Sequence, residues 1–389
     1  MQTQVLPYLR ELAAADVEVY LLTFEPQMQQ LWTAQAVAGE RASLEREGIQ
    51  WSALPYHKKP SAPATLFDIA AGTLAAVRLA RRHGIDVLHA RAHIPLAMAL
   101  IASRLTRCAL IFDLRGLMAE EYADAGVWAA DSLQFRMIKR LEKAGIKKAD
   151  QLVVLTEAMK RWLLDNRLRK ADDVEVIPCC VDFAGYDAAA TRIEPGDETF
   201  EVIYAGSVTG LYLLEEMGRF FLAVRAREPR AFLRILTTSS ASEASERLQR
   251  VGLQPEDFWV GRVSSSEVPR FLQRARLGLS FRKPTFSQLA ASPTKIAEYL
   301  AAGLPVVSNA GIGDVDDLLQ TKPVGVVVRD FTAAEFARAA DAVLALAGDA
   351  RTHARCVEVG RLHFDLRTVG GNRYLRVYRQ IASARRQTR

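Results

Sequence analysis

The sequence predicts an α/β protein with two Rossmann-like domains, each built on a parallel sheet covered by helices. Apolar, strand-like runs alternate with longer helix-like segments along nearly the whole chain, which is typical of open parallel sheets. The length of 389 residues suits two domains, each able to bury a core. A polar run at 187–199, which contains Pro195 and Gly196, divides the alternation into two halves.

The first domain is expected to span residues 1–185. Its predicted strands are Val17–Leu22, Asp86–His89, Ala109–Phe112, Gln151–Leu155 and Val174–Ile177. Its clearest predicted helices are Leu66–His83, Pro95–Leu105 and Ser132–Ala149. Polar residues that directly follow parallel strands gather at one edge of a sheet, where open α/β sheets bind their ligands.

A linker at 186–199 and a second domain at 200–365 follow. The predicted strands of this domain are 200–205, Phe232–Leu236, Phe258–Val260, Gly278–Phe281, Pro305–Ser308 and Val324–Val328. The terminal segment 366–389 is predicted to be helical over Arg367–Ala384, with an apolar side.

Composition and cysteine spacing exclude several classes of protein. Hydrophobic residues make up 50% of the chain and charged residues 25%, which is ordinary for a soluble globular protein. No uninterrupted apolar run has the length of a membrane span, and the N-terminus lacks the layout of a secretory signal. The cysteines show no CxxC spacing, which argues against a disulfide framework and a zinc site. We therefore expect a cytoplasmic protein.

The positive charge leaves two kinds of partner to consider. The formal net charge is +6 and the pI about 9.2, but no RNA-binding, zinc-finger or basic-zipper pattern is present, so nucleic acid is not an expected partner. The segment Ser132–Lys148 reads as a basic amphipathic helix, with Arg136, Arg140, Lys143 and Lys147 in one stripe. Peripheral contact with anionic lipid and an ordinary solvated face both remain open.

The segment 292–309 carries the strongest functional signal. Ser292 is predicted to cap a helix that Pro293 opens and Gly303 ends. Lys295 and Glu298 are three residues apart and therefore lie on one side of that helix. Free N–H groups at a helix start attract phosphate, and a carboxylate can accept hydrogen bonds from a sugar diol. The alternative is an exposed ion pair worth about 0.3 kcal/mol.

This segment resembles the nucleotide-sugar site of the retaining GT-B glycosyltransferases, specifically the family 4-like enzymes of cell-surface polysaccharide synthesis. The resemblance covers nearly the whole chain and is strongest at 280–320. It implies a GT-B fold, in which two Rossmann-like domains face a central cleft and a C-terminal helix crosses back to the first domain. It also implies that Glu298 binds the ribose and that Ser292, Thr294 and Lys295 lie at the diphosphate end.

Two departures from the family concern the donor side. Many relatives hold the diphosphate with an Arg and a Lys near the first glycine loop of the second domain, but the loop that begins at Gly206 has neither. We assign charge neutralisation to Arg282, Lys283 and Lys295, with two solvated loop cations as the alternative for the first two.

The second departure is the first glutamate of a Glu-x7-Glu pair, which falls at Ala290. Some branches with a Pro-Thr-Lys-x-x-Glu-Tyr signature also lack this glutamate, so its absence does not indicate inactivity.

The segment that begins at Gly311 contains a DxD pair, Asp314 and Asp316. Such a pair holds a divalent metal in another glycosyltransferase fold. A glycine turn followed by acids is also a usual helix start, with Asp314 as the cap. We expect no metal here, and the resemblance implies that Gly311 and Gly313 approach the donor sugar.

The acceptor and leaving-group side is expected in the first domain, directly after two strands. The resemblance implies that the Asp-x-Arg-Gly segment at 113–116 faces the cleft. We take Arg91, His93, Asp113, Arg115 and Glu120 as the catalytic candidates. Two alternatives stay open: His93 as an ordinary residue of a helix start, and Asp113 with Arg115 as a structural ion pair.

The beginning of the chain departs from the family pattern. A GT-B enzyme opens on a buried strand and a glycine-rich loop, whereas here a predicted helix begins near Gln4. The strand Val17–Leu22 is then expected to be the second of its domain, with the first strand missing. We favour a true start further upstream over a damaged or specialised member.

The expected function is transfer of a sugar, with retention, from a nucleotide-diphosphate sugar to a glycan or lipid-linked acceptor. Neither a cofactor nor a metal is expected, and the expected location is the cytoplasm, at the inner face of the cell membrane. The alternatives are a catalytically silent nucleotide-sugar-binding protein and a GT-B nucleotide-sugar epimerase, although no acid/base pair for the latter is assigned.

Overall fold

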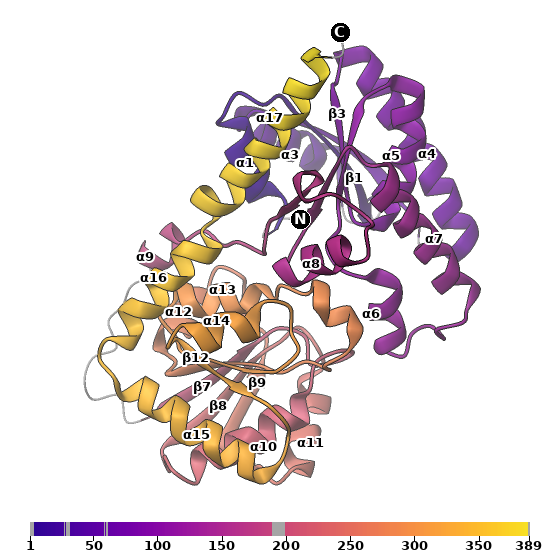
Figure 1. The fold of residues 1–389 in the computed structure, drawn as a ribbon. Coiled ribbons are helices and arrows are strands. Elements are labelled where there is room, and N and C mark those ends of the chain that lie inside the picture. The colour runs from indigo at the N-terminus through magenta and orange to yellow at the C-terminus, as the bar shows by residue number, and fades with distance from the viewer. Residues whose placement is uncertain are drawn as a thin grey trace.

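The computed structural model describes residues 4–26, 28, 32–57, 59, 61–188 and 199–387. These residues form two α/β domains (Figure 1). Every pair of strands within the sheets is parallel. The predicted fold class is therefore confirmed. Most of the predicted linker, residues 189–198, lies outside the described residues.

The strands of the N-terminal domain form two separate sheets. A four-stranded sheet has the order β3-β4-β5-β6, and a two-stranded sheet pairs β1 with β2. Their bounds are β1 Val19–Pro26, β2 Ile49–Tyr56, β3 Val87–Arg91, β4 Ala109–Asp113, β5 Gln151–Val154 and β6 Val174–Val176. No strand among the described residues joins β1 to β3, so each of these two strands has one edge without a β-partner.

Helices cover both faces of the N-terminal sheets. Ala109 and Ile111 of β4 belong to a core with α1 and the C-terminal helix, whereas Leu110 and Phe112 face α5 and α7. This alternation follows from the two-residue period of a strand. The helices are α1 Leu6–Ala13, α3 Ala34–Arg46, α4 Ser61–His83, α5 His93–Thr106, α6 Met118–Asp124, α7 Leu133–Lys148, α8 Glu157–Asp165 and α9 Ala184–Ala188.

The C-terminal domain contains a six-stranded sheet in the order β12-β11-β10-β7-β8-β9. The strands are β7 Phe200–Ala205, β8 Ala231–Leu236, β9 Phe258–Gly261, β10 Leu277–Ser280, β11 Val306–Asn309 and β12 Gly325–Val328. The helices are α10 Leu214–Arg225, α11 Ala241–Arg250, α12 Val268–Arg274, α13 Thr294–Ala301, α14 Val315–Thr321 and α15 Ala333–Gly348. The short 3-10 segment η3, Phe286–Ala290, precedes α13.

The chain returns to the N-terminal domain after α16, Thr352–Phe364. A π-helical turn, η4 at Leu366–Gly371, leads into α17, Asn372–Gln387, which runs along the N-terminal domain in Figure 1. Tyr374, Val377 and Ile381 are buried there in one core with α1. The last helix therefore ties the two domains together through apolar contact.

Candidate functional site

Helix α13 presents the segment that carries the strongest sequence signal. Its cap residue is Pro293, with no side-chain capping bond, so the prediction that Ser292 caps the helix is wrong. The Ser292 hydroxyl instead accepts a hydrogen bond from the backbone N–H of Cys179, 3.1 Å away in the N-terminal domain. The helix ends as predicted, since Gly303 follows it with a φ of +76°, which favours glycine.

Lys295 of α13 is buried between aromatic rings. Its side chain is 6% exposed, and Nζ lies 4.3 Å from the ring centroid of Tyr212 and 4.8 Å from that of Tyr204. A Cβ on Gly206 would lie only 3.2 Å from the same Nζ. An exposed Lys–Glu pair is therefore excluded. Because Gly206, directly after β7, has no side chain, the buried ammonium of Lys295 fits beside it.

The surroundings of Lys295 weaken its hold on a proton. Burial, and then the positive charge of Arg282, lower the pKa of Lys295 to about 7, while Glu298 opposes the shift. A cation kept in such a place is costly unless an anion joins it. The two tyrosine rings offer partial compensation through their π faces.

Arg282 lies beside Lys295, at the end of β10. Its guanidinium carbon is 5.0 Å from the ring centroid of Tyr212, and its Nε is buried with no hydrogen-bond partner among the described residues. The loop after Gly206 runs against this segment, because the N–H of Lys283 donates to the carbonyl of Leu211 at 2.9 Å. Within the described residues neither Lys295 nor Arg282 makes an ion pair. Together they form a positive cluster that is open to an anionic ligand.

Glu298 follows Lys295 by one helical turn. It is half-buried, and burial raises its pKa, with Lys295 opposing. Its carboxylate makes no hydrogen bond within the described part of the chain, so its oxygens are available as acceptors for hydroxyl groups. Thr294 lies at the start of the same helix, half-buried. The structure therefore places Glu298, Lys295 and Thr294 on one helix and Arg282 beside Lys295. Their role at a donor site stays a prediction.

Lys283 is placed differently from the other donor-side cations. Its Nζ donates to the backbone carbonyl of Asp124 at 3.2 Å, across the domain boundary. Asp124 ends α6, which packs against η3 of the C-terminal domain. The side chain of Lys283 thus bridges the two domains rather than joining the positive cluster.

The glycines after β11 both have positive φ angles, and one of them is also closely packed. Gly313 has a φ of +51°, and a Cβ there would clash with the carbonyl of Ala291 and with Thr156. Gly311 has a φ of +85°, and its N–H donates to Asp316 at 2.8 Å. Both positions require glycine in the protein itself, whatever they contribute to a donor site.

Asp314 caps a helix, but not its own. It occupies the cap position of α14 without a side-chain capping bond, so the predicted capping of α14 is wrong. Its carboxylate accepts hydrogen bonds from the N–H groups of Glu157 and Ala158, at 2.6 and 2.9 Å. These residues open α8 in the N-terminal domain, where a carboxylate complements the helix dipole. The described residues contain no cluster of metal ligands.

In the N-terminal domain, His93 and Glu120 belong to one chain of ion pairs. His93 is buried, with Nε2 3.1 Å from Oε2 of Glu142. Lys139 joins the acids, with its Nζ 2.5 Å from Glu142 and 2.6 Å from Glu120. Sequence reasoning found His93 and Glu120 but missed Lys139 and Glu142. The available signal was that Glu142 is a single acid among the six cations of α7.

Glu121 is a second residue that sequence reasoning missed. It is half-buried on α6, and a Cβ on Gly116 would clash with its Oε1. Burial raises the pKa of Glu121, while the positive charge of Arg282 and the nearby His93 oppose the increase. Glu121 is therefore a carboxylate of the N-terminal domain that interacts electrostatically with Arg282 of the C-terminal domain.

Asp113 is fully buried and lies at the centre of a second network, whose cations and histidine are partly exposed. Its Oδ2 accepts hydrogen bonds from Arg91 and from the hydroxyl of Tyr374, both at 2.9 Å. Arg115 lies 3.6 Å from Oδ1, and His89 is 3.5 Å from Oδ2. Burial alone would raise the pKa of Asp113, but Arg115, Arg91 and His89 hold it well below its usual range. The ion pair of the alternative interpretation is present.

Arg115 connects this network to the donor side. Its Nη2 lies 3.2 Å from Sγ of Cys179, whose N–H donates to Ser292 just before α13. The sequence candidates thus fall into two groups. Lys295, Arg282 and Glu298 are grouped without ion-pair partners, whereas Arg91, Asp113, Arg115, His93 and Glu120 are engaged in buried pairs.

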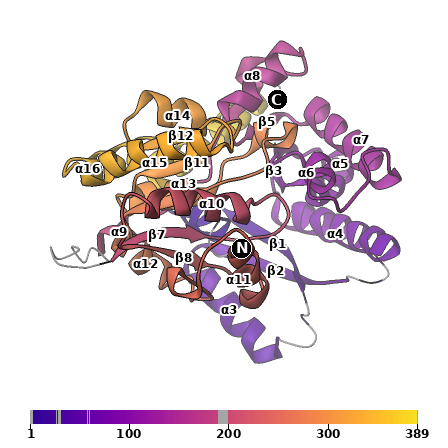
Figure 2. The ribbon, with the colours of Figure 1, turned by 90° about the horizontal axis from the view of Figure 1, so that it is seen from below.

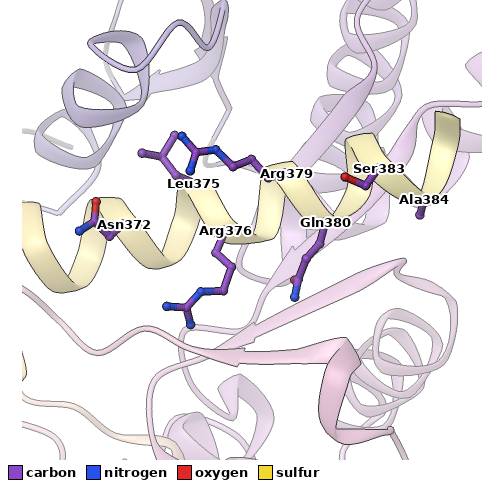
Figure 3. Close-up of a pocket in the computed structure, with 7 residues that line it drawn as sticks. All are labelled: Asn372, Leu375, Arg376, Arg379, Gln380, Ser383 and Ala384. Carbon is purple, nitrogen blue, oxygen red and sulfur yellow. The ribbon is translucent and has the colours of Figure 1, made fainter.

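A separate hollow of about 770 Å³ runs along the outer side of α17 (Figure 3). Its lining comes from that helix: Asn372, Leu375, Arg376, Arg379, Gln380, Ser383 and Ala384. None of these residues belongs to the positive cluster or to the buried networks. The hollow is therefore distinct from the candidate site.

Family models match both domains. Residues 1–184 match the model described as Glycosyltransferase Family 4, and residues 202–346 match Glycosyl transferases group 1. No curated protein sequence matches the chain.

Solved structures of GT-B proteins share the fold. Sucrose-phosphate synthase from Thermosynechococcus elongatus has 17% identity and a TM-score of 0.66, over 94% of this chain and 100% of that chain. Anabaena HepE in complex with UDP and glucose has 15% identity and a TM-score of 0.65, over 95% and 94% of the two chains. A putative UDP-N-acetylglucosamine 2-epimerase from Listeria monocytogenes has 11% identity and a TM-score of 0.56, over 96% and 98%. At these identities the likeness establishes the fold alone.

Proposed function

Because the chain belongs to the GT-B glycosyltransferases, with a family 4 N-terminal domain and a group 1 C-terminal domain, we propose that it transfers a sugar from a nucleotide-diphosphate sugar with retention. The proposed acceptor is a hydroxyl of a glycan or a lipid-linked saccharide in cell-surface polysaccharide synthesis. The proposed location is the cytoplasm, at the inner face of the cell membrane. The binding of UDP and UDP-glucose by Anabaena HepE supports a donor of this class.

The observation that carries this proposal is the positive cluster of Lys295 and Arg282. Two cations beside Gly206 and the start of α13 make no ion pair in the described structure, which suits a ligand that brings two phosphates. Sugar transfer passes through an oxocarbenium-like transition state while the diphosphate gains negative charge. The cluster would stabilise that charge without a metal. Glu298 would accept hydrogen bonds from the ribose.

The N-terminal domain would supply the acceptor side. Glu121 lies where the positive charge of Arg282 reaches across the domain boundary, and His93 is near it within the N-terminal domain. We assign His93 and Glu120 a positioning role, since Lys139 and Glu142 hold them in place. Arg91, Asp113 and Arg115 would hold the end of β4 and the start of α13 in register through Cys179 and Ser292.

Product analysis tests this function directly. The protein would be incubated with UDP-, GDP-, ADP- and TDP-sugars and a saccharide acceptor, each with EDTA present, and the reaction followed by phosphorus and proton NMR. Release of a nucleotide diphosphate, with a first-formed product whose anomeric configuration equals that of the donor, is the expected result. A product of inverted configuration would contradict retention. Loss of activity in EDTA that added Mg²⁺ restores would contradict a metal-free site.

The same spectra distinguish the two alternatives. An epimerase would convert the nucleotide sugar into its epimer without requiring an acceptor. A silent protein would bind a nucleotide sugar, as a thermal shift shows, without any turnover. A matched Glu298→Ala variant controls for contaminating activity, because a reaction that belongs to this site must slow in that variant.

A further inference from the structure

Three helices of the N-terminal domain form a layer with an unusual outer surface. Helix α5 contacts both α4 and α7 and lies between them in Figure 2. Large apolar side chains point outward from all three helices. Leu66 and Phe67 of α4 are 62% and 60% exposed, and Ile101 of α5 and Leu133 and Met137 of α7 are exposed as well. We call this surface the α4–α5–α7 face.

The exposed charges on this face are all positive. Asp68 and Glu142 are the acidic residues within these three helices, and both are buried. His57 pairs with Asp68, and His93 and Lys139 pair with Glu142. The exposed cations are Arg78, Arg81, Arg82, Arg104, Arg136, Arg140, Lys143, Lys147 and Lys148. A surface with one sign of charge and protruding apolar groups is complementary to an anionic, partly apolar partner.

Helix α4 shows the apolar part of this pattern most clearly. By length and composition alone, its residues 62–83 would suffice to cross a membrane, with a mean hydropathy of 1.2 over the most apolar window. Only 28% of that window is buried, whereas a helix of a protein core would be mostly buried. Its other side packs on the domain, where Gly72 meets Met98 and Phe24. The helix therefore lies along the surface of the domain with an apolar side open.

We propose that the α4–α5–α7 face docks on an anionic phospholipid bilayer. Leu66, Phe67 and Met137 would enter the boundary between headgroups and acyl chains, while Arg140 and Lys143 contact lipid phosphates. Bulky apolar side chains lie among the cations on this face, and a lipid bilayer would bury them. Nucleic acid would leave the aliphatic ones in water, so lipid is the favoured partner. The α4–α5–α7 face is thus the surface through which the protein would contact the membrane in the proposed function.

The α4–α5–α7 face adjoins the candidate site. Lys139 of α7 pairs with Glu120 of α6, and α6 reaches the C-terminal domain through Asp124 and Lys283. Docking would thus bring the boundary between the domains close to the bilayer, as a lipid-linked acceptor requires. That last consequence rests on the proposed function, whereas docking itself does not.

Vesicle flotation of the purified full chain tests the inference. The probes are vesicles of phosphatidylcholine alone and of phosphatidylcholine mixed equally with phosphatidylglycerol. We expect flotation with the mixed vesicles only, weakened by salt. The triple variant Arg140→Glu/Lys143→Glu/Lys147→Glu should lower the partition coefficient at least ~100-fold, since each cation contributes roughly fivefold. Leu66→Ser/Phe67→Ser should lower it about tenfold.

A matched triple variant controls for net charge. Arg250→Glu/Arg270→Glu/Lys322→Glu changes three exposed cations of the C-terminal domain, and both triple variants have a formal net charge of 0 instead of +6. The control should keep its partition coefficient within about threefold. Equal losses in the two triple variants would overturn the proposal, as would wild-type protein that does not float with the mixed vesicles.

Two further results separate the possible explanations. Unchanged flotation of Leu66→Ser/Phe67→Ser would mean a purely electrostatic contact with the anionic vesicle surface, and would overturn docking by insertion. Nucleotide-induced thermal shifts of every variant are measured in parallel. If the protein fails to bind vesicles but keeps its nucleotide-induced thermal shift, the docking proposal fails and the proposed function is unaffected. If it binds vesicles but shows no nucleotide-induced shift, the proposed function fails and the docking proposal is unaffected.

Discussion

The two sides of the candidate site hold buried charge in opposite ways. In the C-terminal domain, Lys295 and Arg282 lie close together and have no carboxylate partner in the described structure. In the N-terminal domain, Asp113 and Glu142 are each surrounded by cations and histidines. Paired charges satisfy one another and fix the fold, whereas unpaired cations impose a cost that a bound anion removes. This difference indicates that the C-terminal side of the site binds the anionic ligand.

The largest effect is expected from breaking the paired side. Asp113→Ala would leave Arg115 and the partly exposed Arg91 without a counter-charge and remove the acceptor of Tyr374. The free energy of unfolding should fall by about 3–5 kcal/mol. Chemical denaturation measures this change. A loss below about 1 kcal/mol accompanied by lost transfer activity would instead make Asp113 a catalytic residue.

The unpaired side should respond in ligand affinity rather than in stability. Arg282→Ala should weaken binding of a nucleotide diphosphate by about 2–3 kcal/mol, the range for a hydrogen bond to a charged group. Lys283→Ala is the matched control, because its ammonium donates to Asp124 across the domain boundary. Titration calorimetry should show less than about a threefold change for this control. Equal losses in both variants would place Lys283 in the donor site after all.

Glu298→Ala tests the ribose contact. The loss of hydrogen bonds to its carboxylate should weaken nucleotide binding by roughly 1.5–3 kcal/mol, while the fold stays intact. Calorimetry gives the affinity and circular dichroism the integrity of the fold. An unchanged affinity for the nucleotide would remove Glu298 from the site.

The pH dependence of donor binding is the smallest of these effects. The pKa of Lys295 is about 7 in the free protein, and a bound diphosphate would raise it. Below pH 7 the lysine is already charged, so affinity should be nearly constant. Above pH 7 binding must take up a proton, and affinity should fall by up to about tenfold per pH unit, or about 1.4 kcal/mol. Calorimetry with a nucleotide sugar between pH 6 and 9 measures this slope, and a flat profile would contradict it.

Much of the fold was accessible from sequence because each domain repeats one local pattern. Buried parallel strands such as 109–112 are continuous apolar runs, and these runs gave nearly all the strands. Strand β2 was missed, since Ile49–Tyr56 mixes polar residues with Pro55, which is atypical of a strand that pairs along its length. The cap of α13 was also wrong, because Ser292 bonds to Cys179 in the other domain.

The candidate site was less accessible, because its character depends on contacts between distant segments. The spacing of Lys295 and Glu298 predicts that they share a side of the helix, but the burial of Lys295 comes from Tyr204 and Tyr212, some 90 residues earlier. Of the neighbouring acids on α6, Glu120 pairs with Lys139, whereas Glu121 lies against Gly116 and is influenced by the charge of Arg282. Adjacent helical residues point about 100° apart, so only the structure distinguishes them.

Lys295→Met tests the central claim most directly, since that claim is that a buried, unpaired cation awaits a diphosphate. The lowered pKa means that the fold disfavours the charged lysine, at a cost that is full below pH 7 and vanishes as the pH rises to the usual lysine range. At pH 7 the variant alone should therefore melt higher, by about 1–3 kcal/mol of stability. A nucleotide diphosphate that stabilises the wild type, by about 2.7 kcal/mol at 100 times its Kd, should no longer stabilise the variant. A variant that melts lower than the wild type, yet still gains the full nucleotide shift, would contradict the account.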